Sequence, residues 1–171
     1  TIAQVERLLG SLAHRLAGLP APETAARVLE RARLSAEADR RQALWEAEMA
    51  RRALAQLDLR VILLKGTAYA AAGMEAGQGR MIGDLDILVP RDRLDAAEAA
   101  LLEAGWEWVK PDPYDDAYYR QHMHELPPLI HKARDRMIDV HHTILPLTAR
   151  QRPDAAALIA DAVDLGNGLA V

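Results

Sequence analysis

Two aspartates stand two positions apart at the start of an apolar run. Asp84 and Asp86 lie in residues 80–89, which read RMIGDLDILV. The Leu, Ile and Val content of the second half predicts a buried strand. Because side chains alternate along a strand, both carboxylates are expected on one face and the apolar side chains between them on the other. Two adjacent carboxylates repel each other unless a cation lies between them.

The Asp84–Asp86 pair offers hard oxygen ligands, which suit a divalent cation such as Mg²⁺ and the phosphates of a nucleotide bound to it. Gly83 lacks a side chain just before the pair, which would let a ligand approach the backbone. The same pattern also fits a strand that begins with two solvated aspartates. Because the two charges repel, Asp84→Asn or Asp86→Asn is expected to leave the fold intact or slightly more stable.

An earlier segment has the features of a phosphate-binding turn. Residues 61–64 predict a buried strand, and Lys65-Gly66-Thr67 and a run of helix formers follow it. We expect a helix that begins after a glycine turn, with Thr67 as its N-cap. The first amides of such a helix can bind a phosphate, and Lys65 adds a positive charge. An ordinary strand–turn–helix connection would have the same pattern. Arg80 offers a bidentate fork for further phosphate charge.

A later segment supplies a third acid. Residues 129–132 and 136–141 flank Ala133-Arg134-Asp135 and predict a β-hairpin. Alternation in its second strand places Asp139 and His141 on one face, opposite Ile138 and Val140. His141 is therefore positioned to orient Asp139 or to contact a phosphate.

Five histidines between residues 122 and 142 invite comparison with zinc sites. They are His122, His124, His131, His141 and His142. His122 and His124 could share one strand face. The chain has no cysteine and no helical metalloprotease motif, so zinc-dependent hydrolysis is the weaker interpretation.

The composition is that of an ordinary globular chain. A length of 171 residues, half of them apolar, predicts one domain or one domain with an appendage. The absence of cysteine excludes a disulfide framework and a thiol nucleophile. A net charge of −4 gives no reason to expect DNA as a partner. Without a membrane-spanning run or a visible signal peptide, a cytoplasmic protein is expected. Because it begins at Thr1 and ends abruptly, the chain could be a fragment.

The remaining elements would position these side chains. Apolar spacing predicts a helix over residues 2–16, with Leu8 and Leu12 buried, and a second helix over residues 24–57, with Leu54 buried. Trp45 is expected to pack against the first helix. Further predictions are a helix over 92–104, an edge strand over 106–109, a loop over 110–116, a helix from Pro153 and a final turn at Asn167. Three tyrosines near that loop could shape an acceptor pocket: Tyr114, Tyr118 and Tyr119.

Taken in order, three segments resemble the nucleotidyltransferase superfamily that includes DNA polymerase beta, and in it a bacterial family of uncharacterised nucleotidyltransferases. The segments are Leu64-Lys65-Gly66, Arg80 to Val89, and Ile138-Asp139-Val140-His141. The resemblance implies an α+β fold, in which a mixed β-sheet with flanking helices occupies residues 58–171. An N-terminal helical region, residues 1–57, would precede this nucleotidyltransferase-like domain.

The resemblance also implies a function. Catalytic and metal-binding roles would fall to Asp84, Asp86 and Asp139, with two Mg²⁺ ions. Nucleotide binding would fall to Lys65, Gly66, Thr67, Arg80, Gly83 and His141. Such an enzyme transfers a nucleoside monophosphate from a triphosphate such as ATP to a hydroxyl of an unknown small molecule, protein or RNA, and releases pyrophosphate. The alternative is a non-catalytic nucleotide-binding or assembly module that keeps the fold.

Overall fold

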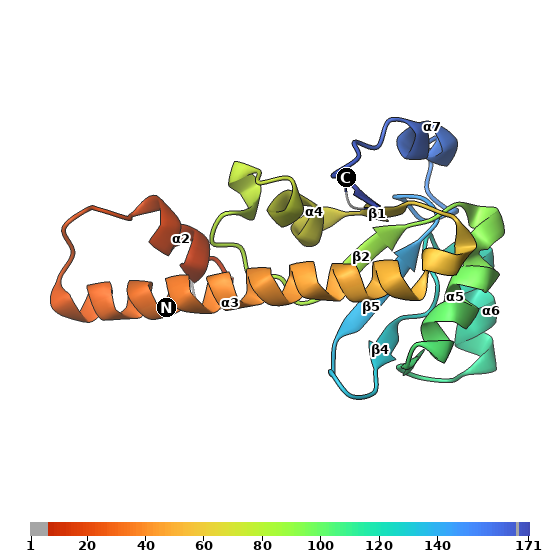
Figure 1. Ribbon diagram of the computed structural model, residues 1–171, viewed down its shortest axis with the longest axis horizontal. Coiled ribbons are helices and arrows are strands. Elements are labelled where there is room, and N and C mark those ends of the chain that lie inside the picture. The colour runs from red at the N-terminus through yellow and green to blue at the C-terminus, as the bar shows by residue number, and fades with distance from the viewer. Residues whose placement is uncertain (1–6, 167) are drawn as a thin grey trace.

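A computed structural model describes residues 7–166 and 168–171. Within these ranges six strands form one mixed sheet in the order β3-β4-β5-β2-β1-β6, flanked by helices (Figure 1). This arrangement confirms the predicted α+β fold with a helical region ahead of the sheet. No helix in the described ranges is both long enough and apolar enough to span a membrane.

The described elements alternate between helices and short strands. The strands are β1 (Val61–Leu63), β2 (Leu85–Leu88), β3 (Trp106–Trp108), β4 (Leu129–His131), β5 (Met137–His141) and β6 (Leu169–Ala170). The α-helices are α2 (Leu9–Arg15), α3 (Glu23–Ala53), α4 (Lys65–Ala71), α5 (Leu94–Glu103), α6 (Pro113–His122) and α7 (Ala155–Ala160). Three single 3₁₀ turns link them, at Ala55–Leu57, Glu75–Gly77 and Arg91–Arg93.

The centre of the sheet brings together strands that are far apart in the sequence. β2 pairs antiparallel with β1 and parallel with β5, and the register sets Asp86 beside Asp139. β4 and β5 pair antiparallel, which confirms the predicted hairpin. β3 lies at the edge of the sheet, as predicted. The two strands that carry the acids are therefore direct neighbours.

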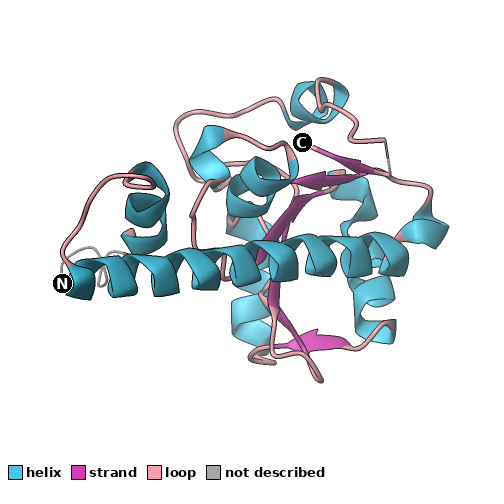
Figure 2. Ribbon diagram, turned by 60° about the vertical axis from the view of Figure 1, so that its left-hand side comes forward, coloured by secondary structure: helices cyan, strands magenta, loops and turns pink. Residues whose placement is uncertain are grey.

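One face of this sheet is buried under α3 and α5 (Figures 1 and 2). Ala47 and Ala50 of α3 and its C-cap residue Leu54 are fully buried and share one core with Ile87 and Val140 of the central strands. Alanines at the contact let a helix lie close to a sheet, because they add little bulk. α3 therefore contributes to the core of the sheet. The division into an N-terminal region, residues 1–57, and a domain, residues 58–171, stays a prediction.

The N-terminal helices pack differently from the prediction. Leu8 and Leu12 were expected to be buried, but they are 56% and 38% exposed. α2 instead turns small residues inward: Gly10 and Ala13 are its buried positions. A side chain at Gly10 would collide with the backbone of Gly79, so α2 fits only through this close approach. The start of the predicted first helix, residues 1–6, lies outside the described residues.

Leu54→Ala is expected to lower the free energy of unfolding by about 2–5 kcal/mol, because it removes a fully buried side chain from the core. The matched control is Leu8→Ala, which removes the same atoms from a side chain that is 56% exposed and should cost less than about 1 kcal/mol. Urea denaturation of the three proteins measures both values. Equal losses in the two variants would contradict this description of the core.

Trp45, which was expected to pack against the first helix, contacts an arginine from a distant turn. Its ring is 46% exposed and lies 5.3 Å from the guanidinium of Arg134, in the β4–β5 turn. Arg134 also pairs with buried Glu46 at 3.0 Å and lies over Trp106 at 4.7 Å. A buried ion pair is stable only when both partners keep a defined geometry. The Arg134–Glu46 pair therefore fixes the position of the β4–β5 hairpin against α3. The sequence did not indicate this contact, because Arg134 comes from a distant turn.

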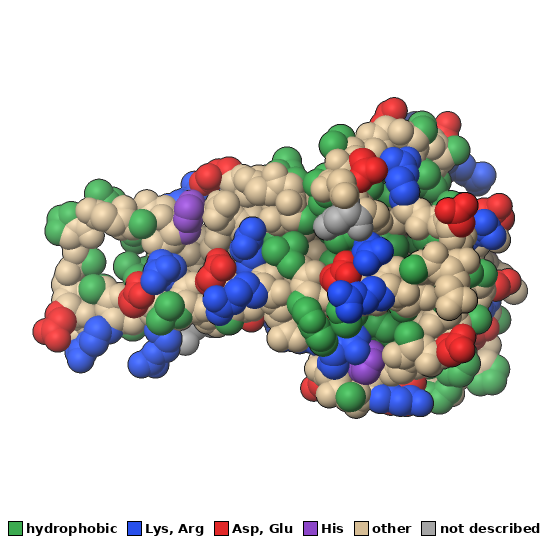
Figure 3. All heavy atoms as spheres, in the orientation of Figure 1, with side chains coloured by type: hydrophobic (Ala, Val, Ile, Leu, Met, Phe, Trp, Pro, Cys, Tyr) green, Lys and Arg blue, Asp and Glu red, His purple; other side chains and the backbone are tan. Residues whose placement is uncertain are grey.

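The outer side of α3 carries both signs of charge. Glu30 pairs with Arg33, and Glu48 pairs with Arg51 and Arg52. Figure 3 shows basic and acidic side chains interspersed along this helix. Such exposed pairs at i,i+3 and i,i+4 spacing support the helix by a few tenths of a kcal/mol each.

α6 occupies part of the segment predicted as a loop over residues 110–116. Asp112 caps it by accepting hydrogen bonds from the amides of Tyr114 and Asp115, and Pro113 is its first residue. An aspartate followed by proline is a helix-start signal that could have been recognised in the sequence. At the other end Arg120 binds Glu98 of α5 at 2.7 Å. This contact positions the chain that leaves α6 toward β5.

The C-terminal segment follows the prediction in part. A helix, α7, begins just after Pro153 and is capped by Asp154. Val163 and Val171, which lie on either side of the predicted final turn, pair through two backbone hydrogen bonds. Asn167, the predicted turn residue, lies outside the described residues.

Candidate active site

Three carboxylates meet on the sheet face that α3 leaves uncovered. One oxygen from each of Asp84, Asp86 and Asp139 lies within 4.8 Å of the others. Asp86 and Asp139 are register partners in the parallel β2–β5 pair, and Asp84 directly precedes β2. The alternating residues Ile87 and Val140 are buried in the core on the opposite face. The predicted proximity of these three acids on adjoining strands is confirmed.

The two acids of the Asp-x-Asp pair have different surroundings. Asp84 is exposed, whereas Asp86 is 2% exposed and accepts hydrogen bonds from Lys65 Nζ at 2.5 Å and from His141 Nε2 at 3.0 Å. Burial raises the pKa of Asp86, but the hydrogen bonds from His141 and Lys65 outweigh it and hold the pKa below its ordinary value. Asp86 is therefore ionised and already paired with two nitrogen groups.

This pairing corrects one prediction. Asp86→Asn was expected to leave the fold intact or slightly more stable by relieving repulsion. Because Asp86 is buried with Lys65 and His141, its loss would leave two polar groups without their charged partner. Asp84 is exposed, so Asp84→Asn is still expected to leave the fold intact or slightly more stable.

Asp139 is the acid whose ionisation is disfavoured by its surroundings. Burial is the largest cause, followed by the charges of Glu125, Asp86 and Asp84, and together they raise its pKa to about 6. Its Oδ1 is buried and has no hydrogen-bond partner among the described residues. A cation beside the cluster would satisfy this oxygen and offset the repulsion. The donor set consists of carboxylate oxygens, which fits Mg²⁺.

A comparison with known protein families covers almost the whole chain. A family model described as uncharacterised nucleotidyltransferase matches residues 1–170. The chain belongs to this family. No curated protein and no solved structure matches it. Family membership supports nucleotidyl transfer as the general chemistry and a nucleotide as the substrate.

The nucleotidyltransferase segment at Lys65-Gly66-Thr67 differs in detail from the prediction. α4 begins at Lys65, and extended Leu64 is its N-cap, so Thr67 is not the cap. The helix therefore starts earlier than the glycine pattern indicated, and its first residue, Lys65, has a φ of 49°. Thr67 is 1% exposed, and its Oγ1 has no hydrogen-bond partner in the part of the chain that the structure describes.

The other predicted nucleotide-binding residues surround α4 and the start of β2. A Cβ on Gly66 would lie 3.2 Å from Nε of Arg80, so the Arg80 side chain would have to shift by a few tenths of an ångström to admit it. The Arg80 guanidinium lies 5.7 Å from the ring centre of Tyr69 on α4. A Cβ on Gly83 would have nothing within 4 Å, so packing does not require glycine there. Their roles in binding a nucleotide stay predictions.

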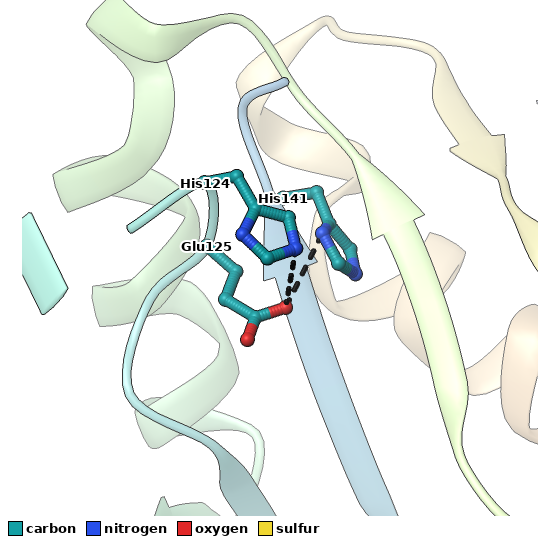
Figure 4. Close-up of side chains that lie close together, drawn as sticks. All are labelled: His124, Glu125 and His141. Carbon is teal, nitrogen blue, oxygen red and sulfur yellow. Dashed lines mark ion pairs between the residues drawn. The ribbon is translucent and has the colours of Figure 1, made fainter. Parts of the chain in front are cut away.

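The histidines separate into two groups. His124 and His141 lie together with Glu125, and their ring centres are 5.1 Å apart (Figure 4). The others have structural contacts: His122 lies against Tyr118, His131 packs edge-on against Trp106, and His142 is within 3.2 Å of the Met123 carbonyl. His122 is the last residue of α6, so the expectation that it shares a strand face with His124 is wrong.

Glu125 is the residue that the sequence did not indicate. It forms an isolated antiparallel bridge with His141, and its charge contributes to the raised pKa of Asp139. His141 itself bonds Asp86 and not Asp139. The loop after α6 has no strand-like alternation, so only the tertiary structure brings Glu125 to β5.

The three tyrosines do not act as a group. Tyr114 and Tyr118 are 77% and 47% exposed. Tyr119 is half-buried, and its pKa is raised first by burial and then by the charges of Glu125 and Asp139. A role for the tyrosines in an acceptor pocket stays a prediction.

In the metal-free protein Asp139 is expected to contribute a loss of stability as the pH rises from about 4 to about 6. In this range the unfolded chain releases the Asp139 proton while the folded chain, with a pKa of about 6, retains it. The loss is complete above about pH 6. It amounts to about 1–2 kcal/mol, after a reduction for partial exposure of the carboxyl.

The measurement is urea denaturation in a chelator at several pH values. Asp139→Asn should lack this component and exceed the parent in stability above pH 6. Asp135→Asn is the matched control, because Asp135 is exposed on the same hairpin and asparagine tolerates its φ of 53°. The same pH slope in Asp139→Asn and the parent would contradict the raised pKa.

Proposed function

We propose that this protein is a Mg²⁺-dependent enzyme that transfers a nucleoside monophosphate from a nucleoside triphosphate to a hydroxyl acceptor. The observation that supports it most is the cluster of Asp84, Asp86 and Asp139 on adjacent parallel strands, in a chain of the nucleotidyltransferase family. Carboxylates from two rigid strands are suited to hold metal ions in a defined geometry.

In this proposal the three carboxylates hold the metal. A Mg²⁺ ion held there would supply positive charge to neutralise the phosphates and to lower the pKa of the acceptor hydroxyl. Asp139 lies beside the metal ligands on β5 and is the proposed acceptor of the hydroxyl proton. The acceptor oxygen forms a bond to the α-phosphorus, the bond from that phosphorus to the bridging oxygen breaks, and pyrophosphate leaves.

The surrounding residues supply positive charge and position. Lys65 Nζ is hydrogen-bonded to Asp86, so its charge stands beside the carboxylates and is available to a phosphate. The first amides of α4, at Lys65, Gly66 and Thr67, have no helical partner and are the proposed contacts for the β- and γ-phosphates. His141 is 1% exposed and acts by orienting Asp86.

The acceptor supplies the hydroxyl that attacks the α-phosphorus. A small molecule, a protein side chain and an RNA end each offer a hydroxyl. The direct test is incubation with each labelled triphosphate, Mg²⁺ and cell extract, followed by a search for labelled product. Label should appear with the parent and with Asp135→Asn, and not with Asp84→Asn. Nucleotide binding without pyrophosphate release would instead identify a non-catalytic module.

Mg²⁺ and a triphosphate together are expected to raise the melting temperature more than the sum of their separate effects. The reason is linkage, because each ligand reduces the charge that opposes the binding of the other at the carboxylates. At concentrations about 100-fold above the dissociation constant the gain is roughly 2.7 kcal/mol. Calorimetry measures it, with Asp84→Asn as the control. No shift at millimolar concentrations of both ligands would contradict a nucleotide site.

A further inference from the structure

The loop that follows α6 is hydrogen-bonded to the C-terminal end of β5. The amide of His142 donates to the carbonyl of His124 at 2.9 Å, and the amide of Leu126 donates to the carbonyl of Val140 at 2.9 Å. Leu126 is 1% exposed and anchors the loop in the core. His124 and Glu125 are therefore held beside His141 by the backbone.

The three side chains converge on one point. Glu125 Oε2 lies 3.6 Å from His124 Nε2 and 3.3 Å from His141 Nδ1, and it points between the two rings (Figure 4). Bonds of about 2.0–2.2 Å in a tetrahedral arrangement separate neighbouring ligand atoms by roughly 3.3–3.6 Å. These two separations match a shared metal ion.

The hydrogen bond of His141 to Asp86 also favours a metal ion at this point. An ionised carboxylate only accepts hydrogen bonds, so Nε2 of His141 carries the proton that it donates to Asp86 at 3.0 Å. In the neutral ring the lone pair is then on Nδ1. A metal-binding histidine typically has this arrangement, with its second nitrogen bonded to a carboxylate.

The lone pair on Nδ1 of His141 has no hydrogen-bond donor among the described residues. The His141 side chain is 1% exposed, and Nδ1 forms no hydrogen bond with any of residues 7–166 or 168–171, although Glu125 Oε2 is 3.3 Å away. Two electron-rich atoms at this distance repel each other unless a cation lies between them. A cavity of about 250 Å³ borders both His124 and His141, which leaves room for an ion to enter.

We propose that His124, Glu125 and His141 bind a divalent transition-metal ion, Zn²⁺ or an ion with the same ligand preference. Two imidazoles and one carboxylate favour such an ion over Mg²⁺, which prefers oxygen ligands. The site is separate from the Asp84–Asp86–Asp139 cluster but is connected to it, because His141 binds Asp86. It goes beyond the proposed transfer reaction and does not depend on it.

The test is titration of tag-free, chelator-treated protein with Zn²⁺ alone, followed by calorimetry, and with Co²⁺, whose visible absorption reports tetrahedral coordination. We expect one ion per chain. Glu125→Gln and His124→Asn should each weaken Zn²⁺ binding by at least about 10–100-fold. Both are used because one of them could fail to fold, which circular dichroism in chelator shows directly.

Two controls make the result specific. His122→Asn removes a nearby histidine outside the cluster and should not change the affinity. Asp84→Asn should abolish Mg²⁺-dependent nucleotide binding and keep Zn²⁺ binding, which separates this proposal from the proposed function. Absence of Zn²⁺ binding below about 100 μM would overturn the proposal and indicate that a proton neutralises His141 and Glu125. Equal losses in Asp84→Asn and Glu125→Gln would also overturn it, because the ion would then occupy the carboxylate cluster.

Discussion

Asp139→Asn is expected to reduce nucleotidyl transfer by about 10³-fold and to leave nucleotide binding within a few-fold of the parent. Loss of a general base typically costs 10²–10⁴ in rate. Asp139 combines a position beside Asp86 with a pKa of about 6, and asparagine keeps its shape without its proton affinity. Asp84 and Asp86 remain to hold the metal–nucleotide complex. Pyrophosphate release measures the rate, and calorimetry measures binding.

The same substitution separates the two candidate functions. Asp135→Asn, on the exposed turn of the same hairpin, should match the parent in both assays. If Asp139→Asn released pyrophosphate at the parental rate, the three-carboxylate mechanism would be wrong. If neither protein released pyrophosphate while both bound nucleotide, the non-catalytic module would be the better account.

Asp86→Asn is expected to abolish Mg²⁺-dependent nucleotide binding and also to lower the free energy of unfolding by about 1–3 kcal/mol. The second effect arises because Asp86 is 2% exposed and is the shared acceptor of Lys65 and His141. Removing the charge from one side of a buried pair leaves the other side uncompensated. The expected loss in the free energy of unfolding is moderate because Lys65 is half exposed and can reach water.

Asp84→Asn is the matched control for Asp86→Asn. It removes the same charge from an exposed position just before β2, so nucleotide binding should be lost while stability changes little. Thermal denaturation in chelator measures stability, and calorimetry with Mg²⁺ and a triphosphate measures binding. Equal stability losses in the two variants would show that the Lys65 and His141 contacts contribute little.

Local patterns in the sequence predicted much of the candidate site. Alternation in β2 and β5 assigned Asp86 and Asp139 to the faces opposite Ile87 and Val140, and the burial of these apolar residues agrees. The hairpin around residues 133–135 followed from two strand-like runs and a short turn. These inferences succeeded because the faces of a strand are set by the backbone within a few residues.

Local patterns failed where the partner of a residue lies far away in the chain. Leu8 and Leu12 have helical spacing, but Gly10 makes the close contact of α2 with the rest of the protein. Trp45 pairs with Arg134, almost ninety positions later. Helical spacing indicates which side chains share a face, but only tertiary packing decides what that face contacts.

By itself the sequence determined the candidate acids, the strands that carry them and the side of each strand to which they belong. Only the tertiary structure decided that β2 and β5 are parallel neighbours in a register that sets Asp86 beside Asp139. It also decided that Lys65 and His141 both bind Asp86, and that Glu125 reaches His141. The reason is physical: the direction of a side chain depends on its own backbone, whereas its partners depend on how the whole core packs.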